Sequence, residues 1–116
     1  MQLSYKTPIW LYPVAVDFRK QIDGLVLLVA DQLGLNPSSG ELFIFRSRNA
    51  KKIKLLWYDD QGFWLCYKRL ERGRLKFPRQ RDEVFEISRD QLAWLLSGLD
   101  MQKQVALPRV LPTHFY

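Results

Sequence analysis

The residues of this chain with the most evident chemistry are the basic side chains of its middle third. Twelve of the 18 lysine and arginine residues lie between positions 46 and 81, together with only three of the 12 acidic residues. The rest of the chain has six basic and nine acidic residues, so the net charge of +6 is concentrated in this window. Such a concentration indicates an anionic partner, with nucleic acid as the first candidate. A solvated basic surface that only aids solubility is the alternative.

Two strand-like runs in this window form a predicted hairpin that mixes basic and aromatic residues. With a three-residue loop, in which Gly62 takes a positive φ, Lys54 would lie directly opposite Lys68. Like charges at opposite positions destabilise a sheet, and a bound phosphate would offset that repulsion while nearby rings offered stacking surfaces. Alternatively, the lysine heads extend into water, or a four-residue loop places Tyr58 opposite Phe63 and removes this pairing.

We therefore predict one positive surface, formed by the hairpin and the segments next to it, that contacts phosphate groups. Arginine suits bidentate phosphate contacts, while lysine acts as a point charge. Phosphate contacts carry no base information, so the surface should bind many sequences similarly. Its predicted members are Arg46, Arg48, Lys54, Lys68, Arg69, Arg72 and Arg74.

Other chemistries have fewer candidate residues. Asp59, Asp60 and Glu71 would be the carboxylates of a metal-dependent nuclease if they met across the hairpin. However, the aspartates are ordinary turn residues, and Glu71 has basic neighbours as ion-pair partners. The single histidine, His114, and the single cysteine, Cys66, are too few for a zinc site, and the thiol is expected to be buried and structural. We predict no catalytic residue, no metal and no cofactor.

The spacing of apolar residues predicts an α+β domain, with one main helix packed on an antiparallel sheet and a short C-terminal helix. The main helix is expected over residues 18–33, with Asp17 as its N-cap and Gly34 as its stop. Ser88 and Gln91 form a predicted capping box ahead of the second helix. Strands are predicted at residues 9–12, 42–46, 53–58, 63–70 and 84–87.

Length and composition limit the class of protein. The chain has 116 residues, 47% of them hydrophobic and 14% aromatic, which is typical of one folded domain. We assign that domain to residues 1–102 and expect residues 103–116 to be an extended or mobile tail. No apolar run approaches the roughly 20 residues of a membrane helix. The first residues lack a signal-peptide pattern, and one cysteine cannot form an internal disulfide, so we expect a cytoplasmic protein with no membrane contact.

Five segments between residues 10 and 100 resemble a known family. Residues 18–25 carry an Arg-Lys-x-x-Asp-Gly-Leu motif, although Gln21 stands where a small residue is expected. Residues 39–48 carry Ser-Gly-x-Leu-Phe-x-Phe-x-x-Arg. Three further blocks fit residues 53–62, 68–78 and 92–100. In order and spacing the chain resembles the TnpB-type accessory protein of the insertion-sequence 66 family. The resemblance implies a bacterial mobile element, a separate and larger transposase as partner, and a role in transposition.

Three functions are compatible with these observations. The first, which we predict, is a non-catalytic accessory protein that binds nucleic acid, most readily DNA, through the basic hairpin. The second is a protein–protein adaptor for the separate transposase, and the third is a small metal-dependent nuclease. Strongly salt-dependent DNA binding favours the first. Co-purification with the transposase without DNA binding favours the second, and metal-dependent cleavage lost on Asp59→Ala favours the third.

Overall fold

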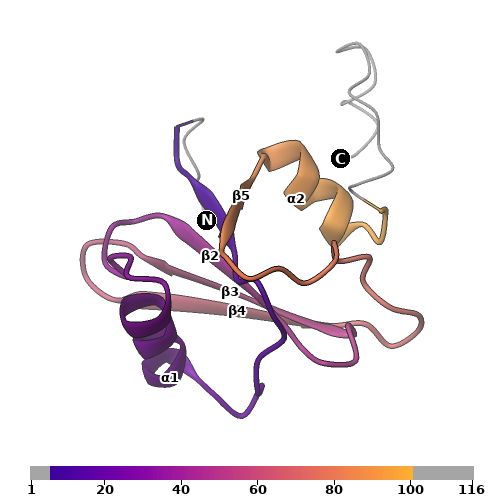
Figure 1. The fold of residues 1–116 in the computed structure, drawn as a ribbon, viewed down its shortest axis with the longest axis horizontal. Coiled ribbons are helices and arrows are strands. Elements are labelled where there is room, and N and C mark those ends of the chain that lie inside the picture. The colour runs from indigo at the N-terminus through magenta and orange to yellow at the C-terminus, as the bar shows by residue number, and fades with distance from the viewer. Residues whose placement is uncertain (1–5, 101–116) are drawn as a thin grey trace.

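The computed structural model of the chain describes residues 6–100 (Figure 1). The tail predicted at residues 103–116 lies outside the described residues. The elements, in chain order, are β1 (Ile9–Leu11), α1 (Ile22–Leu27) with its π-helical continuation η1 (Leu28–Gln32), β2 (Leu42–Arg46), β3 (Lys52–Tyr58), β4 (Phe63–Arg69), β5 (Phe85–Ile87) and α2 (Arg89–Leu96).

The described strands form one five-stranded sheet in the order β4-β3-β2-β1-β5. β1 pairs with β2 in parallel, and every other neighbouring pair is antiparallel. The chain passes from β1 to β2 through α1, and a helical crossover of this kind returns the second strand in the same direction as the first. The predicted α+β class, with one main helix and a short C-terminal helix, is confirmed, but the sheet is mixed rather than wholly antiparallel.

Both faces of the sheet are covered, because successive strand residues point to opposite sides and both sides carry apolar residues. On the face that we call the α2 face, Ile44 and Leu55 belong to one buried cluster with Leu95. On the opposite face, the α1 face, Phe45 belongs to a second buried cluster with Leu25. Figure 1 shows the two helices on opposite sides of the sheet. β4 is the outermost strand at its end of the sheet, so its outer edge pairs with no other strand of the described chain.

The main helix begins later than predicted. Its first residue is Ile22, whereas periodicity predicted a start at Phe18. Asp17 does cap a backbone group, but that group belongs to a separate turn: its Oδ1 accepts from the Arg19 amide at 2.9 Å. The Asp17 carbonyl accepts from the Lys20 amide at 3.1 Å. This turn holds Phe18 out of the helix and in front of the sheet, which becomes important for the candidate site.

Two helix boundaries predicted from local signals are confirmed. Gly34 follows the main helix with a φ of 64°, a conformation in which glycine avoids the strain of other residues. At the start of α2, the Ser88 hydroxyl accepts from the Gln91 amide at 3.0 Å. The Gln91 side-chain oxygen accepts from the Ser88 amide at 2.8 Å, which completes the capping box.

The loop of the β3–β4 hairpin has four residues, so the three-residue register is wrong and the alternative, a four-residue loop, is observed. Tyr58 is paired with Phe63, and Asp60 rather than Gly62 takes the positive φ, at 80°. The reason lies in Asp59, whose Oδ1 accepts from the Gln61 and Gly62 amides at 3.1 and 3.0 Å. Its Oδ2 accepts from the Trp64 indole at 2.6 Å. The aspartate side chain therefore organises the loop that the glycine was expected to organise.

The observed register changes which charges meet. Lys54 lies opposite Tyr67, and Lys68 lies opposite Ile53, so the predicted Lys54–Lys68 pair does not exist. A like-charge pair does occur two residues away, where Lys52 lies opposite Arg69. Directly opposite residues share a face, and both members of this pair are on the α1 face with Tyr67.

Candidate nucleic-acid interface

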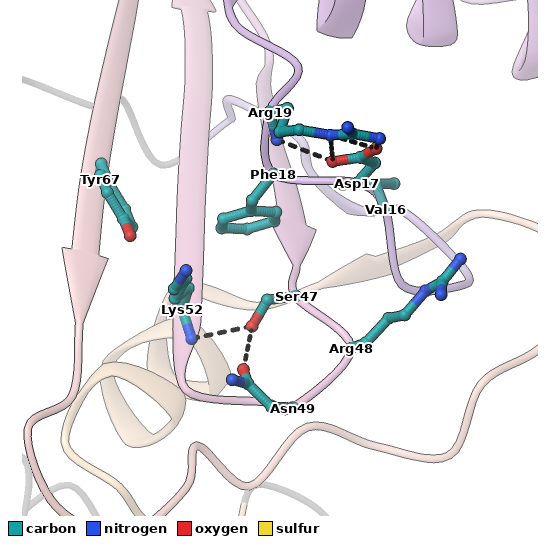
Figure 2. A pocket seen from close by; sticks show the side chains of 9 residues that line it. All are labelled: Val16, Asp17, Phe18, Arg19, Ser47, Arg48, Asn49, Lys52 and Tyr67. Atoms are coloured by element: carbon teal, nitrogen blue, oxygen red, sulfur yellow. Dashed lines mark hydrogen bonds and ion pairs between the residues drawn. The ribbon is translucent and has the colours of Figure 1, made fainter.

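A hollow of about 540 Å³ opens on the α1 face, between the turn that precedes α1 and the loop that joins β2 to β3 (Figure 2). Three of its lining side chains are basic and two are aromatic, and we call it the basic hollow. A volume of this size is within the range of pockets that hold small organic ligands. Its lining residues are Val16, Asp17, Phe18, Arg19, Ser47, Arg48, Asn49, Lys52 and Tyr67.

The β2–β3 loop forms one wall of the hollow and is held by its own side chains. The Ser47 hydroxyl donates to Asn49 Oδ1 at 2.8 Å and accepts from the Lys52 amide at 3.0 Å. Asn49 Oδ1 also accepts from the Lys51 amide at 3.0 Å. These bonds satisfy the polar groups of a tight connection and leave Arg48 exposed at its tip. Figure 2 shows the Arg48 side chain extending toward the Val16 side of the hollow, away from Lys52 and Tyr67.

The opposite wall is the turn before α1, where one ion pair governs the charge. Arg19 Nη2 lies 2.6 Å from Asp17 Oδ2, and Arg19 Nε also donates to the same carboxylate. The hydrogen bonds to Arg19 hold the pKa of Asp17 far below its ordinary value, and the same bonds raise the pKa of Arg19. Because both side chains are exposed, the pair contributes little to stability. It does reduce the net charge of this wall, so the positive character of the hollow comes mainly from Arg48 and Lys52.

A buried lysine lies against the two aromatic rings of the hollow. Lys54 is only 2% exposed, and its Nζ donates to the carbonyls of Phe18 and Lys20 at 2.9 and 2.7 Å. Burial lowers the pKa of Lys54 below its ordinary value. Its two bonds reach backbone groups of the turn before α1 and tie that turn to β3. Lys54 therefore positions the hollow without presenting its charge on the outer surface.

Two aromatic rings lie above this lysine. Lys54 Nζ is 4.9 Å from the centre of the Phe18 ring and 5.5 Å from that of Tyr67, distances typical of cation–π contacts. The two rings meet edge to face, with centres 6.1 Å apart and an interplanar angle of 72°. Phe18 is half-buried, while Tyr67 remains 54% exposed. The hollow thus presents an open tyrosine ring on the side of Lys52, with Arg48 on its other side (Figure 2).

Two of the seven predicted phosphate-contacting residues lie at the hollow or beside it, and two more are on a segment tied to the β2–β3 loop. Arg48 lines it, and Arg69 shares the α1 face beside Lys52. Arg69 also forms an ion pair with Glu71, with Nε and Oε2 3.2 Å apart, but both side chains are exposed and the pair is weak. Arg72 and Arg74 are exposed on the segment after β4, which two backbone hydrogen bonds tie to the β2–β3 loop.

The other three do not belong to this surface, so the seven residues do not form one continuous patch. Arg46 is 5% exposed on the α2 face, where its Nη1 donates to the Pro78 carbonyl at 2.6 Å. Burial lowers its pKa to about 10. Lys54 is buried, as described above. Lys68 is exposed on the α2 face and donates to the Leu96 carbonyl at 2.9 Å, at the end of α2.

Sequence reasoning selected Arg48 but missed the other basic and aromatic residues of the hollow, which are Phe18, Arg19, Lys52 and Tyr67. Phe18 and Arg19 were assigned to the main helix, because their spacing continues its periodicity. Lys52 was within the basic window and was not selected, and Tyr67 was expected to face the core. A correct hairpin register would have found Lys52, Tyr67 and Arg69 together on one face, since side chains alternate along a strand. The Asp17-x-Arg19 spacing was the only local sign of the turn.

The remaining candidate chemistry is not assembled. Across residues 6–100, no three or more His, Cys, Asp or Glu side chains are grouped closely enough to hold a metal ion. Asp59 is instead bound to the hairpin loop and to Trp64, and these bonds lower its pKa. Cys66 is exposed on β4, so the prediction of a buried thiol was wrong; the α2 face is uncovered at this edge strand. None of the helices in the described residues is long and apolar enough to cross a membrane.

Comparison with known proteins gives one family. Residues 7–106 match the family described as IS66 Orf2 like protein. This chain belongs to that family. The chain is also 41% identical over 92 residues to the uncharacterized protein y4hO of Sinorhizobium fredii, which covers 79% of this chain and 80% of the relative. The uncharacterized protein y4jC of the same organism is 34% identical over 98 residues, or 84% of each chain. No solved structure matches this IS66 Orf2-like protein.

Proposed function

We propose that this IS66 Orf2-like protein is a non-catalytic accessory factor of transposition that binds DNA in the cytoplasm, beside a separate transposase. The binding surface is the basic hollow together with the exposed cations next to it, Arg69, Arg72 and Arg74. The role in transposition is supported by the family.

The observation that carries the proposal is the pair of uncompensated cations at the hollow. Neither Arg48 nor Lys52 has an acidic partner within residues 6–100, whereas Arg19 and Arg69 each have one. Lys52 also lies directly opposite Arg69, and this arrangement is unfavourable in a free sheet. A phosphate bound between them would offset the repulsion. Fold stability alone provides no comparable reason for placing Lys52 and Arg69 directly opposite each other beside an open tyrosine ring.

A salt titration of DNA binding tests this function. Fluorescence anisotropy of a labelled oligonucleotide should show affinity that falls steeply as salt rises, because cations on the protein displace condensed counterions. Arg48→Ala and Lys52→Ala should each weaken binding and reduce the salt slope by about one. Lys68→Ala is the matched control, because it removes an exposed cation of the same hairpin from the opposite face. Equal affinity and slope for the parent and both hollow variants would refute the proposal.

A second function, adaptor for the transposase, is favoured by the outer edge of β4. This seven-residue strand has no partner on its outer side within the described chain. Trp64 is 54% exposed on it and stacks on Trp57, with ring centres 5.9 Å apart. Unpaired edges with exposed aromatic residues are suited to pairing with another chain. Loss of transposase co-purification on Trp64→Ser, with DNA affinity unchanged, would support this role in addition to DNA binding.

A further inference from the structure

We propose that the basic hollow takes an unpaired nucleotide of single-stranded DNA, with its base stacked on Tyr67 and its phosphates held by Arg48 and Lys52. This inference rests on the proposed function and adds to it the class of DNA. A surface that contacts only phosphates makes no base contacts, so it has no base contact by which to distinguish a single strand from a duplex. The hollow has three features that would distinguish a single strand from a duplex.

The first feature is the open ring of Tyr67. This side chain is on the edge strand and 54% exposed, so it provides much less apolar burial than the core aromatic residues. Every base has a flat π face, and stacking on an aromatic side chain holds single strands with little dependence on sequence. A base within a duplex is already stacked and paired, so it cannot lie on a ring inside a hollow unless it leaves the helix.

The second feature is that the ring is held in place before any ligand binds. Lys54 Nζ lies 5.5 Å from the Tyr67 ring centre on the protein side, and the edge-to-face contact with Phe18 limits its rotation. Lys54 is itself fixed by two backbone carbonyls. Little ordering of these side chains would accompany binding, which favours affinity.

The third feature is a polar group suited to the edge of a base. Asn49 uses its Oδ1 for both of its bonds within the β2–β3 loop, to Ser47 and to Lys51. The Asn49 side-chain nitrogen is therefore left to donate a hydrogen bond to a ligand. Asn49 lines the hollow next to Arg48 in the β2–β3 loop (Figure 2). The carbonyl and ring nitrogen acceptors of an unpaired base are suitable partners. An acidic peptide would satisfy the cations but would leave the flat ring without a matching partner.

Affinity for single and double strands gives the test. An oligothymidylate of about 16 nucleotides, long enough for one site of this size, is compared with a duplex of the same length at low salt. The parent should prefer the single strand. Tyr67→Ala should weaken binding of the single strand by about 5- to 150-fold, the loss of one stacked base, and weaken duplex binding much less. Tyr67→Phe should retain the preference, because it keeps the flat ring.

The chain offers a matched control for the ring. Trp64 is on the same strand, is equally exposed at 54%, and lies on the opposite face, so Trp64→Ala should leave the preference unchanged. If Tyr67→Ala does not fold, Tyr67→Leu keeps apolar bulk over Lys54 without a flat ring and should also lose the preference. The affinity for an oligouridylate of equal length, compared with that for the oligothymidylate, tests whether the unpaired nucleotide belongs to DNA or to RNA.

The outcomes separate this inference from the proposed function. Equal affinity of the parent for duplex and single strand, with Tyr67→Ala like the parent, would overturn the inference and leave phosphate binding intact. No binding of either DNA would overturn both. Loss of the preference on Trp64→Ala rather than on Tyr67→Ala would place the site on the α2 face and overturn the inference. Tighter binding of the oligouridylate than of the oligothymidylate would overturn the assignment to DNA.

Discussion

Replacement of Lys54 by methionine removes the hydrogen bonds that hold the turn before α1 on the sheet, together with the cation–π contacts to Phe18 and Tyr67. Methionine keeps the length and apolar bulk of the lysine stem, so packing changes little. The variant loses the two bonds from Nζ to the carbonyls of Phe18 and Lys20, at 2.9 and 2.7 Å. Hydrogen bonds from a charged group are worth about 1.5–3 kcal/mol each, or roughly 3–6 kcal/mol for both. Part of this is offset, because an ammonium group no longer has to be buried.

We therefore expect Lys54→Met to lower the free energy of unfolding by about 2 kcal/mol, which in a domain of this size lowers Tm by about 8–16 °C. Urea unfolding followed by tryptophan fluorescence measures the change, with the m-value checked for constancy. The control is Lys68→Met, which removes one exposed bond to the end of α2 and should lose about 0.5 kcal/mol. A loss for Lys54→Met no larger than for Lys68→Met would refute the reasoning, because the two bonds would then have no net value.

Two further predictions concern charged groups that are not at the hollow. Arg46 Nε and Nη2 have no hydrogen-bond partner within residues 6–100. The free energy of unfolding of Arg46→Met should therefore be within about 1 kcal/mol of the parent's or higher, and its DNA affinity should be unchanged. Arg46→Ala should lose about 2 kcal/mol of unfolding free energy, because it also removes the packing of the side-chain stem. Equal losses for both variants in urea unfolding would contradict this. The pKa of Asp59 is lowered from 3.8 by its bonds to Trp64 and the loop amides, so its contribution is present above 3.8 and lost as pH falls through the lowered pKa. NMR titration of its carboxyl carbon should show this, and a midpoint at or above 3.8 would contradict it.

The fold class could be predicted because its signals are local. The strands at residues 42–46, 53–58 and 63–70 and the capping box of α2 follow from periodicity and from residues no more than a few positions apart. The parallel pairing of β1 with β2 could not be read in this way, because it depends on a partner about 30 residues away. The order of strands in the sheet is a global property with no local signature.

The candidate site was harder to predict, because single bonds determined its geometry. The hairpin loop contains a glycine at a plausible turn position, yet the Asp59 side chain and the positive φ of Asp60 set a longer loop. One residue of register moves every side chain of a strand to the other face. The burial of Lys54 depends on carbonyls 36 and 34 positions away, and that of Arg46 on a carbonyl 32 positions away. None of these three carbonyls is marked in the sequence, since every residue carries one.

The cations of the basic window therefore fall into two groups, buried ones that hold loops and exposed ones that could bind an anion. A count of basic residues does not tell the two groups apart. Arg46 and Lys54 are buried and donate to backbone carbonyls, so they connect loops to the sheet and their charges are shielded from solvent. Arg48 and Lys52 are at a rim where no carboxylate of the described chain balances them. The buried Lys54 also contributes to the hollow, because its cation–π contact holds the ring of Tyr67 in place. A basic window in a small domain is thus better judged by which cations lack a carbonyl or carboxylate partner than by its net charge, since only those gain from an added phosphate.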